Sequence, residues 1–289
     1  MENVYTRSDR EQDHVWKKLS DEDKRYAEEW LNETDEGKRN GFKMIRRWLD
    51  QNNSLDARID DFLILRFLRV CKFDVKKTKN RMRSRYKQRS KLPQWFLNKD
   101  PFLPELQELI NLGIYLPLLK PDNQGRLVII IRPAVYDPRT TDVANVVKLY
   151  LILLETAVKY YPAASIYGYV MIVDLTGITI RHLVQYRPSL LMNAVQMWQN
   201  YPIRILSINI FNVPAIFEAT AMILRSFMSE KLRNRFHMSS SMKPDDFKDI
   251  PTDTLPVEYG GTGGTIQELT KFWKKTAEKN RDVILEEEK

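Results

Sequence analysis

Cysteine and histidine are scarce in this sequence of 289 residues, which contains one cysteine, Cys71, and three histidines. One cysteine cannot form an internal disulfide, and so few scattered ligands do not predict a zinc site. The Gly-x-Ser-x-Gly nucleophile elbow and the Gly-Lys-Ser/Thr phosphate loop are also missing. We therefore expect neither a hydrolase nor an NTPase, and we expect no metal and no other cofactor.

Long hydrophobic runs are missing as well. The stretch 149–154 is among the longest, whereas a membrane-spanning helix needs about 18 apolar residues. The first residues have neither the basic n-region nor the apolar h-region of a secretory signal peptide. We expect a cytoplasmic protein that associates with membranes peripherally and does not cross them.

The composition is that of a folded protein, with 43% hydrophobic, 11% aromatic and 29% charged residues. This length predicts one large domain, or a larger domain with a smaller helical appendage. The net charge is +8, and the segment 66–91 alone contains twelve basic residues and one acid, Asp74. Such a run is either a solvated helix face or a surface for an anionic partner, a nucleic acid or an acidic membrane.

Residues 1 to about 100 have apolar positions at helical spacing and no run of β-branched residues, so they are predicted to be helical. Ser20 and Asp23 form a capping-box pattern before one helix. Asp60 and Asp61 precede another helix, which begins near Phe62.

Three short apolar runs later in the chain predict buried strands at 127–131, 169–173 and 205–211. Their apolarity is continuous rather than alternating, which is typical of parallel strands covered on both faces. The stretches 143–161 and 182–200 between them have helical length and periodicity. The order strand, helix, strand, helix, strand predicts an α/β fold with right-handed crossovers.

The segment 215–228 follows the third strand and carries only two charges, Glu218 and Arg225. Two alternatives stay open for this apolar helix. It is buried in the core, or it is a movable lid that covers an apolar cavity with one face and meets a membrane with the other.

Two features superficially suggest enzyme chemistry. The glycine cluster 260–264 does not follow a strand, as a dinucleotide fingerprint requires, so we interpret it as a loop. Asp174 ends the second strand, and we interpret it as a structural cap rather than a catalytic carboxylate.

Seven short motifs occur in one order between about residues 40 and 275, and together they resemble the CRAL-TRIO lipid-binding family, in the pattern of its tocopherol- and retinaldehyde-binding members. The motifs are FLILRFLR at 62–69 with KFD at 72–74, DNQGR at 122–126, DLTG at 174–177, YPIR at 201–204, NIFNVP at 209–214, FMSEK at 227–231 and LPVEYGG at 255–261. The resemblance implies a helical N-terminal domain at 1–100, a lipid-binding cage with a mainly parallel sheet at 101–265, and a C-terminal helix and tail at 266–289. The lid helix, from 214 to about 228, corresponds to the mobile gate of that family.

The resemblance also implies a basic cluster beside the gate that recognises phosphoinositide headgroups. Carried over by position, the cluster consists of Arg69, Arg204, Lys231, Arg233 and Arg235. Leu206 stands where the tocopherol-binding member has a basic residue. Met192 stands where phosphatidylinositol-transfer members have a glutamate, and Arg225 where they have a gate lysine. Because an apolar methionine cannot accept inositol hydroxyls, we favour a single-chain or ring-bearing lipophile inside the cavity.

We therefore predict a non-enzyme that binds a small hydrophobic ligand, such as a tocopherol, a retinoid or a carotenoid, and transfers it between phosphoinositide-containing membranes. Alternatives are a sensor or scaffold that presents a lipid to a partner, and a phosphatidylinositol-transfer protein. A nucleic-acid binder that uses 81–91 is a remote third alternative, and we do not expect nucleic acid as a partner. The expected cavity wall consists of Val147, Tyr150, Leu151, Leu154, Tyr169, Val173, Met192, Met197, Tyr201, Ile216, Phe217, Ile223 and Phe227.

Overall fold

The computed structural model describes residues 19–52 and 59–286, so residues 1–18 and 53–58 of the predicted helical segment and 287–289 of the predicted tail lie outside the described part. The helical prediction for the first hundred residues is confirmed where the chain is described. The helices there are α2 (Asp21–Leu31), α3 (Asp35–Asp50), α4 (Asp61–Val70), α5 (Val75–Lys91) and the short α6 (Pro93–Phe96), followed by α7 (Pro104–Asn111).

The predicted helix starts are confirmed by their hydrogen bonds. Ser20 Oγ accepts from the Asp23 backbone N–H at 3.0 Å, and the Asp23 carboxylate accepts from the Ser20 backbone N–H at 2.8 Å. Asp60 caps α4 by accepting from the Leu63 N–H at 2.6 Å. These side chains satisfy backbone donors that a helix N-terminus leaves without intrahelical partners.

A five-stranded sheet forms the centre of the rest of the chain, in the order β1-β2-β3-β4-β5. Its strands are β1 (Tyr115–Pro117), β2 (Leu127–Ile131), β3 (Tyr169–Asp174), β4 (Ile205–Phe211) and β5 (Phe236–Met238). β1 pairs antiparallel with β2, and every other pair is parallel. The three predicted strands and the predicted α/β class are therefore confirmed, and two three-residue strands at the sheet edges are additional.

The remaining helices follow the sheet strands. They are α8 (Val143–Tyr160), α9 (Ala164–Tyr167), α10 (Ile180–Gln185), α11 (Pro188–Asn200), α12 (Glu218–Ser226), α13 (Glu230–Arg233), α14 (Ile266–Lys279) and α15 (Arg281–Glu286), with 3₁₀ turns η1 (Ala215–Phe217), η2 (Pro244–Phe247) and η3 (Val257–Tyr259). The helix expected at 182–200 is in fact two helices, because Pro188 lacks a backbone N–H and begins α11 as its first residue.

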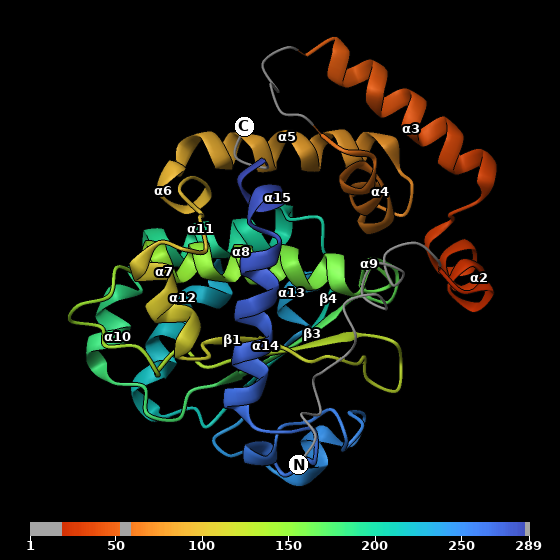
Figure 1. Cartoon of the computed structure of the whole chain (residues 1–289). Coiled ribbons are helices and arrows are strands. Elements are labelled where there is room, and N and C mark those ends of the chain that lie inside the picture. The colour runs from red at the N-terminus through yellow and green to blue at the C-terminus, as the bar shows by residue number, and fades with distance from the viewer. Residues whose placement is uncertain (1–18, 53–58, 287–289) are drawn as a thin grey trace.

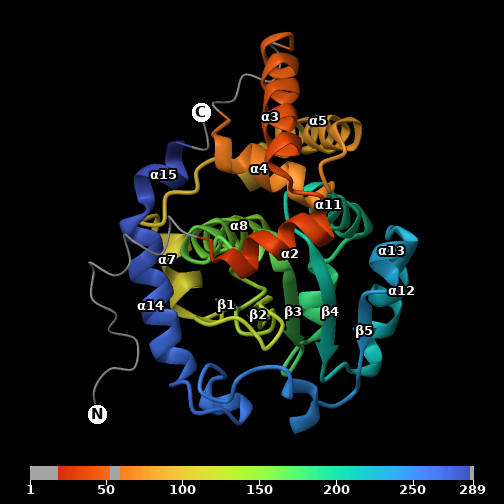
Figure 2. The ribbon, with the colours of Figure 1, turned by 90° about the vertical axis from the view of Figure 1, so that its right-hand side faces the viewer.

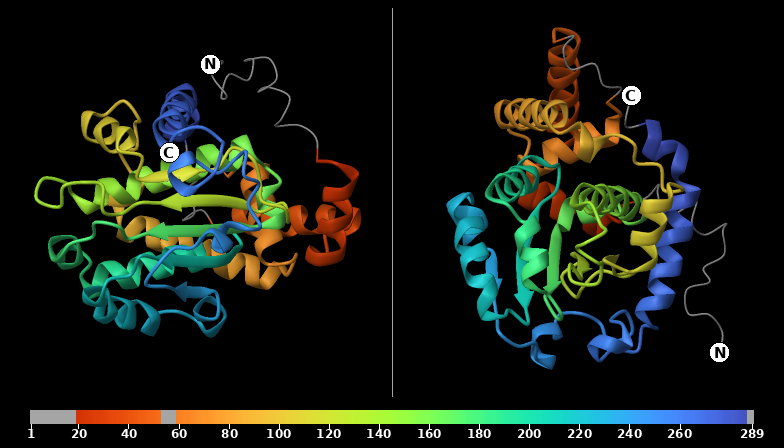
Figure 3. Two further views of the ribbon diagram at one scale, coloured as in Figure 1. Left: turned by 90° about the horizontal axis from the view of Figure 1, so that it is seen from below. Right: turned by 90° about the vertical axis from the view of Figure 1, so that its left-hand side faces the viewer.

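The layers place a candidate site on one face of the sheet. Helices α8 and α11 lie over that face, and α4 and α5 lie outside them (Figure 1). α12 and α13 lie beside β5, while α7 and α14 lie at the β1 edge (Figure 2). The strands run side by side between these helices (Figure 3). Among the residues described, no helix is both long enough and apolar enough to cross a membrane. The domain boundaries at 100 and 265 stay a prediction.

Candidate functional site

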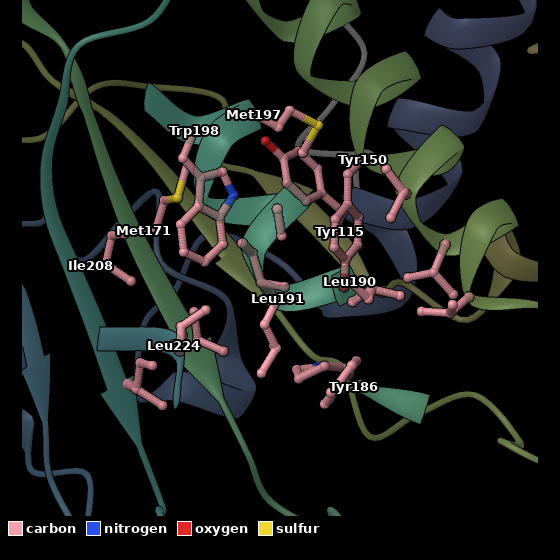
Figure 4. A pocket seen from close by; sticks show the side chains of 18 of the residues that line it. Tyr115, Tyr150, Met171, Tyr186, Leu190, Leu191, Met197, Trp198, Ile208 and Leu224 are labelled. Carbon is pink, nitrogen blue, oxygen red and sulfur yellow. The ribbon is translucent and has the colours of Figure 1, made fainter. Parts of the chain in front are cut away.

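An apolar cavity lies between the sheet and helices α8, α11 and α12. The volume of this cavity is about 180 Å³. Figure 4 shows Trp198, Met171 and Ile208 on one side of this space and Tyr115 and Tyr150 on the other. None of the described side chains that line the cavity carries a formal charge. Such a space suits an uncharged, largely apolar ligand.

Most of the predicted wall residues line this cavity. They are Val147, Tyr150, Leu151, Leu154, Val173, Met197, Tyr201 and Phe217. They come from α8, from β3, from α11 and the residue after it, and from η1. Their contact with a ligand stays a prediction.

Tyr169, Met192, Ile216, Ile223 and Phe227 do not belong to the wall. Tyr169 is fully buried where β3 begins. Met192, Ile216 and Ile223 are 36%, 49% and 36% exposed, respectively, because they lie on the outer faces of their helical turns. Phe227 is half-buried at the end of α12. The side chain of Met192 therefore says nothing about the ligand. The uncharged cavity wall is the observation that disfavours an inositol phosphate inside the cavity.

Several wall residues were missing from the prediction, among them Tyr115, Met171, Tyr186, Leu190 and Trp198. On α11, lining residues recur every three or four positions, from Leu190 and Leu191 through Ala194 to Met197 and Trp198. That periodicity was readable in the sequence. Tyr115 was not, because a three-residue strand gives no alternation to detect.

The segment 214–228, which is predicted to be a lid, has one inner and one outer face. Phe217 and Leu224 are buried and line the cavity, whereas Met222 on the outer face is 72% exposed. The segment is therefore not a fully buried core helix. Arg225 lies 5.3 Å from the centroid of the Phe236 ring and does not line the cavity.

A second pocket lies between the start of α5 and the β4–α13 side of the sheet. Its volume is about 650 Å³, and no described acidic side chain lines it. Its cations define what we call the basic pocket: Lys72, Lys77, Arg81, Arg204, Lys231 and Arg235. Lys77 also pairs with Asp74 at its edge, with Nζ and Oδ2 3.1 Å apart.

The cations of the basic pocket repel one another. The pKa of the Lys231 ammonium is lowered, first by burial and then by Arg235, Arg204, Arg81 and Lys72. An anion bound among these groups would relieve both the repulsion and the loss of solvation. Arg81 donates from Nη2 to the Tyr201 carbonyl at 2.8 Å, and Arg204 and Arg235 donate to the carbonyls of Ile166 and Ile205. These bonds fix the guanidinium groups in place.

Two members of the predicted phosphoinositide cluster do not lie in the basic pocket. Arg69 is 1% exposed, and it donates to the Glu33 carboxylate at 2.7 and 2.8 Å and to Ser165 Oγ at 2.6 Å. Its guanidinium is thus committed inside the protein. Arg233 is exposed and donates to the Met228 carbonyl at 3.2 Å. Position in a motif did not separate these arginines from Arg204 and Arg235, because only packing decides which way each one points.

A buried ion pair contacts one residue of the cavity wall, Tyr201. Arg66 Nη1 lies 2.6 Å from Glu155 Oε2, and the Tyr201 hydroxyl donates to the same carboxylate. Burial alone would raise the pKa of Glu155, but Arg66 outweighs it and the pKa is lowered. The pair joins α4 to α8 and orients Tyr201 at the cavity.

The two pockets share part of their walls. Trp198 and Ile203 line both the apolar cavity and the basic pocket. Arg81, a member of the basic pocket, holds the carbonyl of Tyr201, which lines the cavity. A ligand in either pocket would therefore contact residues that also line the other.

Asp174 has the structural role expected of it. Its carboxylate accepts from Thr176 Oγ1 at 2.6 Å, from Asn212 Nδ2 at 2.8 Å and from the Tyr259 hydroxyl at 3.0 Å. These bonds tie the end of β3 to the loops after β4 and before the glycine cluster. The cluster itself is a loop, as expected.

Family comparisons agree with this geometry. A model described as the CRAL/TRIO domain matches residues 112–261, which is more than half of the chain, and one described as "Pinta-like, UBA domain" matches 34–106. The chain belongs to the CRAL/TRIO family of lipid-binding and lipid-transfer proteins. The resemblance seen in the motifs is confirmed.

The individual relatives resemble this chain at low sequence identity. Alpha-tocopherol transfer protein-like of Mus musculus is 29% identical over 220 residues, which are 76% of this chain and 63% of that protein. Clavesin-2 of Rattus norvegicus is 26% identical over 205 residues, 71% of this chain and 62% of that protein. The chain thus spans less than two thirds of the length of these relatives. The crystal structure of Sfh5 superposes with a TM-score of 0.53 at 14% identity, over 85% of this chain and 88% of that one, which shows the shared fold.

Proposed function

We propose that this chain binds one small hydrophobic lipid in the apolar cavity and transfers it between membranes, to which it binds peripherally. The uncharged cavity wall carries the proposal. An ionised headgroup there would lose its hydration with no lining charge to compensate. Tocopherols, retinoids, carotenoids and similar lipophiles have the required chemistry.

Entry of such a ligand requires the wall to move. A cavity of about 150 Å³ is enough for a molecule the size of benzene, so the 180 Å³ found here is too small for a long lipophile. Met222 on α12 and Ile216 on the preceding turn η1 are exposed apolar side chains, and they would meet lipid tails as this part of the wall swings outward. Membrane contact would favour the open form and ligand the closed one, which is differential binding to two states.

The basic pocket supports a second part of the proposal, the recognition of a phosphoinositide headgroup during exchange. Guanidinium groups fixed by backbone carbonyls offer several donors to phosphate oxygens. A patch that acts by charge alone contributes about 1 kcal/mol per basic residue and does not distinguish anionic lipids. A pocket of this shape should distinguish them.

Transfer between vesicles tests both parts. Donor vesicles contain a fluorescent lipophile, and acceptor vesicles contain either a phosphoinositide or phosphatidylserine at equal total charge. Wild type should transfer faster to the phosphoinositide vesicles. Lys77→Ala/Lys231→Ala should lose that preference, because both side chains line the basic pocket.

The matched control is Lys76→Ala/Lys87→Ala, which removes two exposed cations of the same helix α5 that do not line the pocket. The control should keep the preference. Equal losses in both double variants would reduce the pocket to general surface charge. No transfer by wild type, with the lipophile still bound, would instead favour a lipid-presenting sensor or scaffold.

A further inference from the structure

Two tyrosine hydroxyls in the cavity have nothing to bond to. Tyr115 on β1 and Tyr150 on α8 both line the cavity, and their ring centroids are 5.2 Å apart (Figure 4). Tyr115 is 3% exposed. Within the described parts of the chain, neither hydroxyl has a hydrogen-bond partner. Tyr150 is partly buried, and the tyrosine hydroxyl that is fully buried without a partner is that of Tyr169, which does not line the cavity.

The other polar side chains of the wall are differently placed. The Tyr201 hydroxyl is bonded to Glu155, and the Tyr186 side chain is bonded to Tyr136. Trp198 is shared with the basic pocket, so its indole is not enclosed by the cavity alone. Thr220 belongs to the gate helix α12. Among the described wall residues outside α12, the hydroxyl donors without a partner are therefore those of Tyr115 and Tyr150.

The chemistry of the pair restricts the ligand. Burial raises the pKa of both phenols, so each hydroxyl keeps its proton and can donate it in a hydrogen bond. A ligand oxygen would accept from these hydroxyls. No described cation lines the cavity, so a carboxylate would enter without a counter-charge.

Building on the proposed lipid-binding function, we propose that Tyr115 and Tyr150 are the specificity-determining residues of the cavity. They select an uncharged lipophile that carries a hydroxyl or carbonyl oxygen, and they orient that oxygen toward β1 and α8. A pure hydrocarbon leaves both hydroxyls unpaired, and an ionised fatty acid is rejected by the uncharged wall.

Three probes with one carbon skeleton test this selection: phytol, the hydrocarbon phytane and phytanic acid at neutral pH. Dissociation constants are measured for wild type and for Tyr115→Phe and Tyr150→Phe. Wild type should bind phytol most tightly. Each substitution should weaken phytol binding by about 3- to 10-fold, the effect of one hydrogen bond, and leave phytane binding unchanged.

Tyr160→Phe is the control, since Tyr160 also belongs to α8 but packs against Phe272 and Trp273 and does not line the cavity. It should change neither affinity. Equal losses for phytol and phytane, or binding of phytanic acid as tight as that of phytol, would overturn the selection. If a variant fails to fold, the order of the affinities of wild type for the three probes still tests the selection. Binding of none of the probes by wild type would overturn the proposed function itself.

Discussion

Replacing Arg69 should destabilise the protein and leave the proposed phosphoinositide preference unchanged. Arg69→Met would leave the carboxylate of Glu33, which is 8% exposed, without its main partner, and Ser165 without a donor. Breaking a buried ion pair from one side costs about 3–5 kcal/mol. Lys38 Nζ remains 3.6 Å from Glu33 Oε1, so we expect the lower end, about 3 kcal/mol. At about 2–4 °C per kcal/mol, the melting temperature should fall by about 6–12 °C.

Thermal and urea unfolding measure the effect. Lys72→Met is the control, because Lys72 is exposed and belongs to the basic pocket, so its loss should cost under about 0.5 kcal/mol. Arg69→Met/Glu33→Leu should regain most of the stability, since it removes the unpaired charge as well. Folded Arg69→Met should keep the phosphoinositide preference in vesicle transfer. Unchanged stability together with a lost preference would refute this reasoning and return Arg69 to the headgroup site.

Three further predictions concern other parts of the structure. Because the pKa of Glu155 is lowered from 4.5, the stabilisation by the Arg66–Glu155 pair is fully present above about pH 4.5 and is lost as the pH falls toward the lowered pKa. The melting temperature of wild type should therefore fall relative to that of Arg66→Met/Glu155→Leu in acid, and the difference between the two should stay constant near neutral pH. Gly261→Ala should destabilise by more than about 2 kcal/mol in urea unfolding, since the new Cβ would lie 1.9 Å from the Leu255 carbonyl oxygen; Gly260→Ala, with open space around it and φ +84°, should cost only about 1 kcal/mol. Arg81→Ala should speed ligand dissociation in stopped-flow experiments, because Arg81 holds the carbonyl of Tyr201 in the cavity wall, whereas Lys87→Ala should not change that rate.

The parts of the fold that follow from local chemistry were predictable from the sequence. The strands around Val128 and Val170 are continuous apolar runs, the strand around Ile208 is mostly apolar, and the caps at Ser20 and Asp60 are short patterns of polar residues. The break of the expected helix at Pro188 was also readable, because proline favours the first position of a helix. The edge strands were not, since three residues show no period.

Only the site residues that family resemblance or helix periodicity indicates could be predicted from the sequence. The motif positions led to Arg204, Lys231 and Arg235, which do line the basic pocket. They could not reveal that Arg69 is paired with Glu33, because the two residues are distant in sequence and meet only through packing. For the same reason, the sequence could not reveal Tyr115 as a neighbour of Tyr150.

Native mass spectrometry after exposure to a neutral-lipid extract tests the central claim, that one lipophile occupies the apolar cavity. Ala194 lines the cavity on α11, and Ala194→Trp would fill it. Met192 is on the same helix outside the cavity wall, so Met192→Trp is the matched control. We predict one bound lipid per chain for wild type and Met192→Trp, and none for folded Ala194→Trp. Equal lipid binding by all three proteins, or no bound lipid on wild type, would contradict the claim.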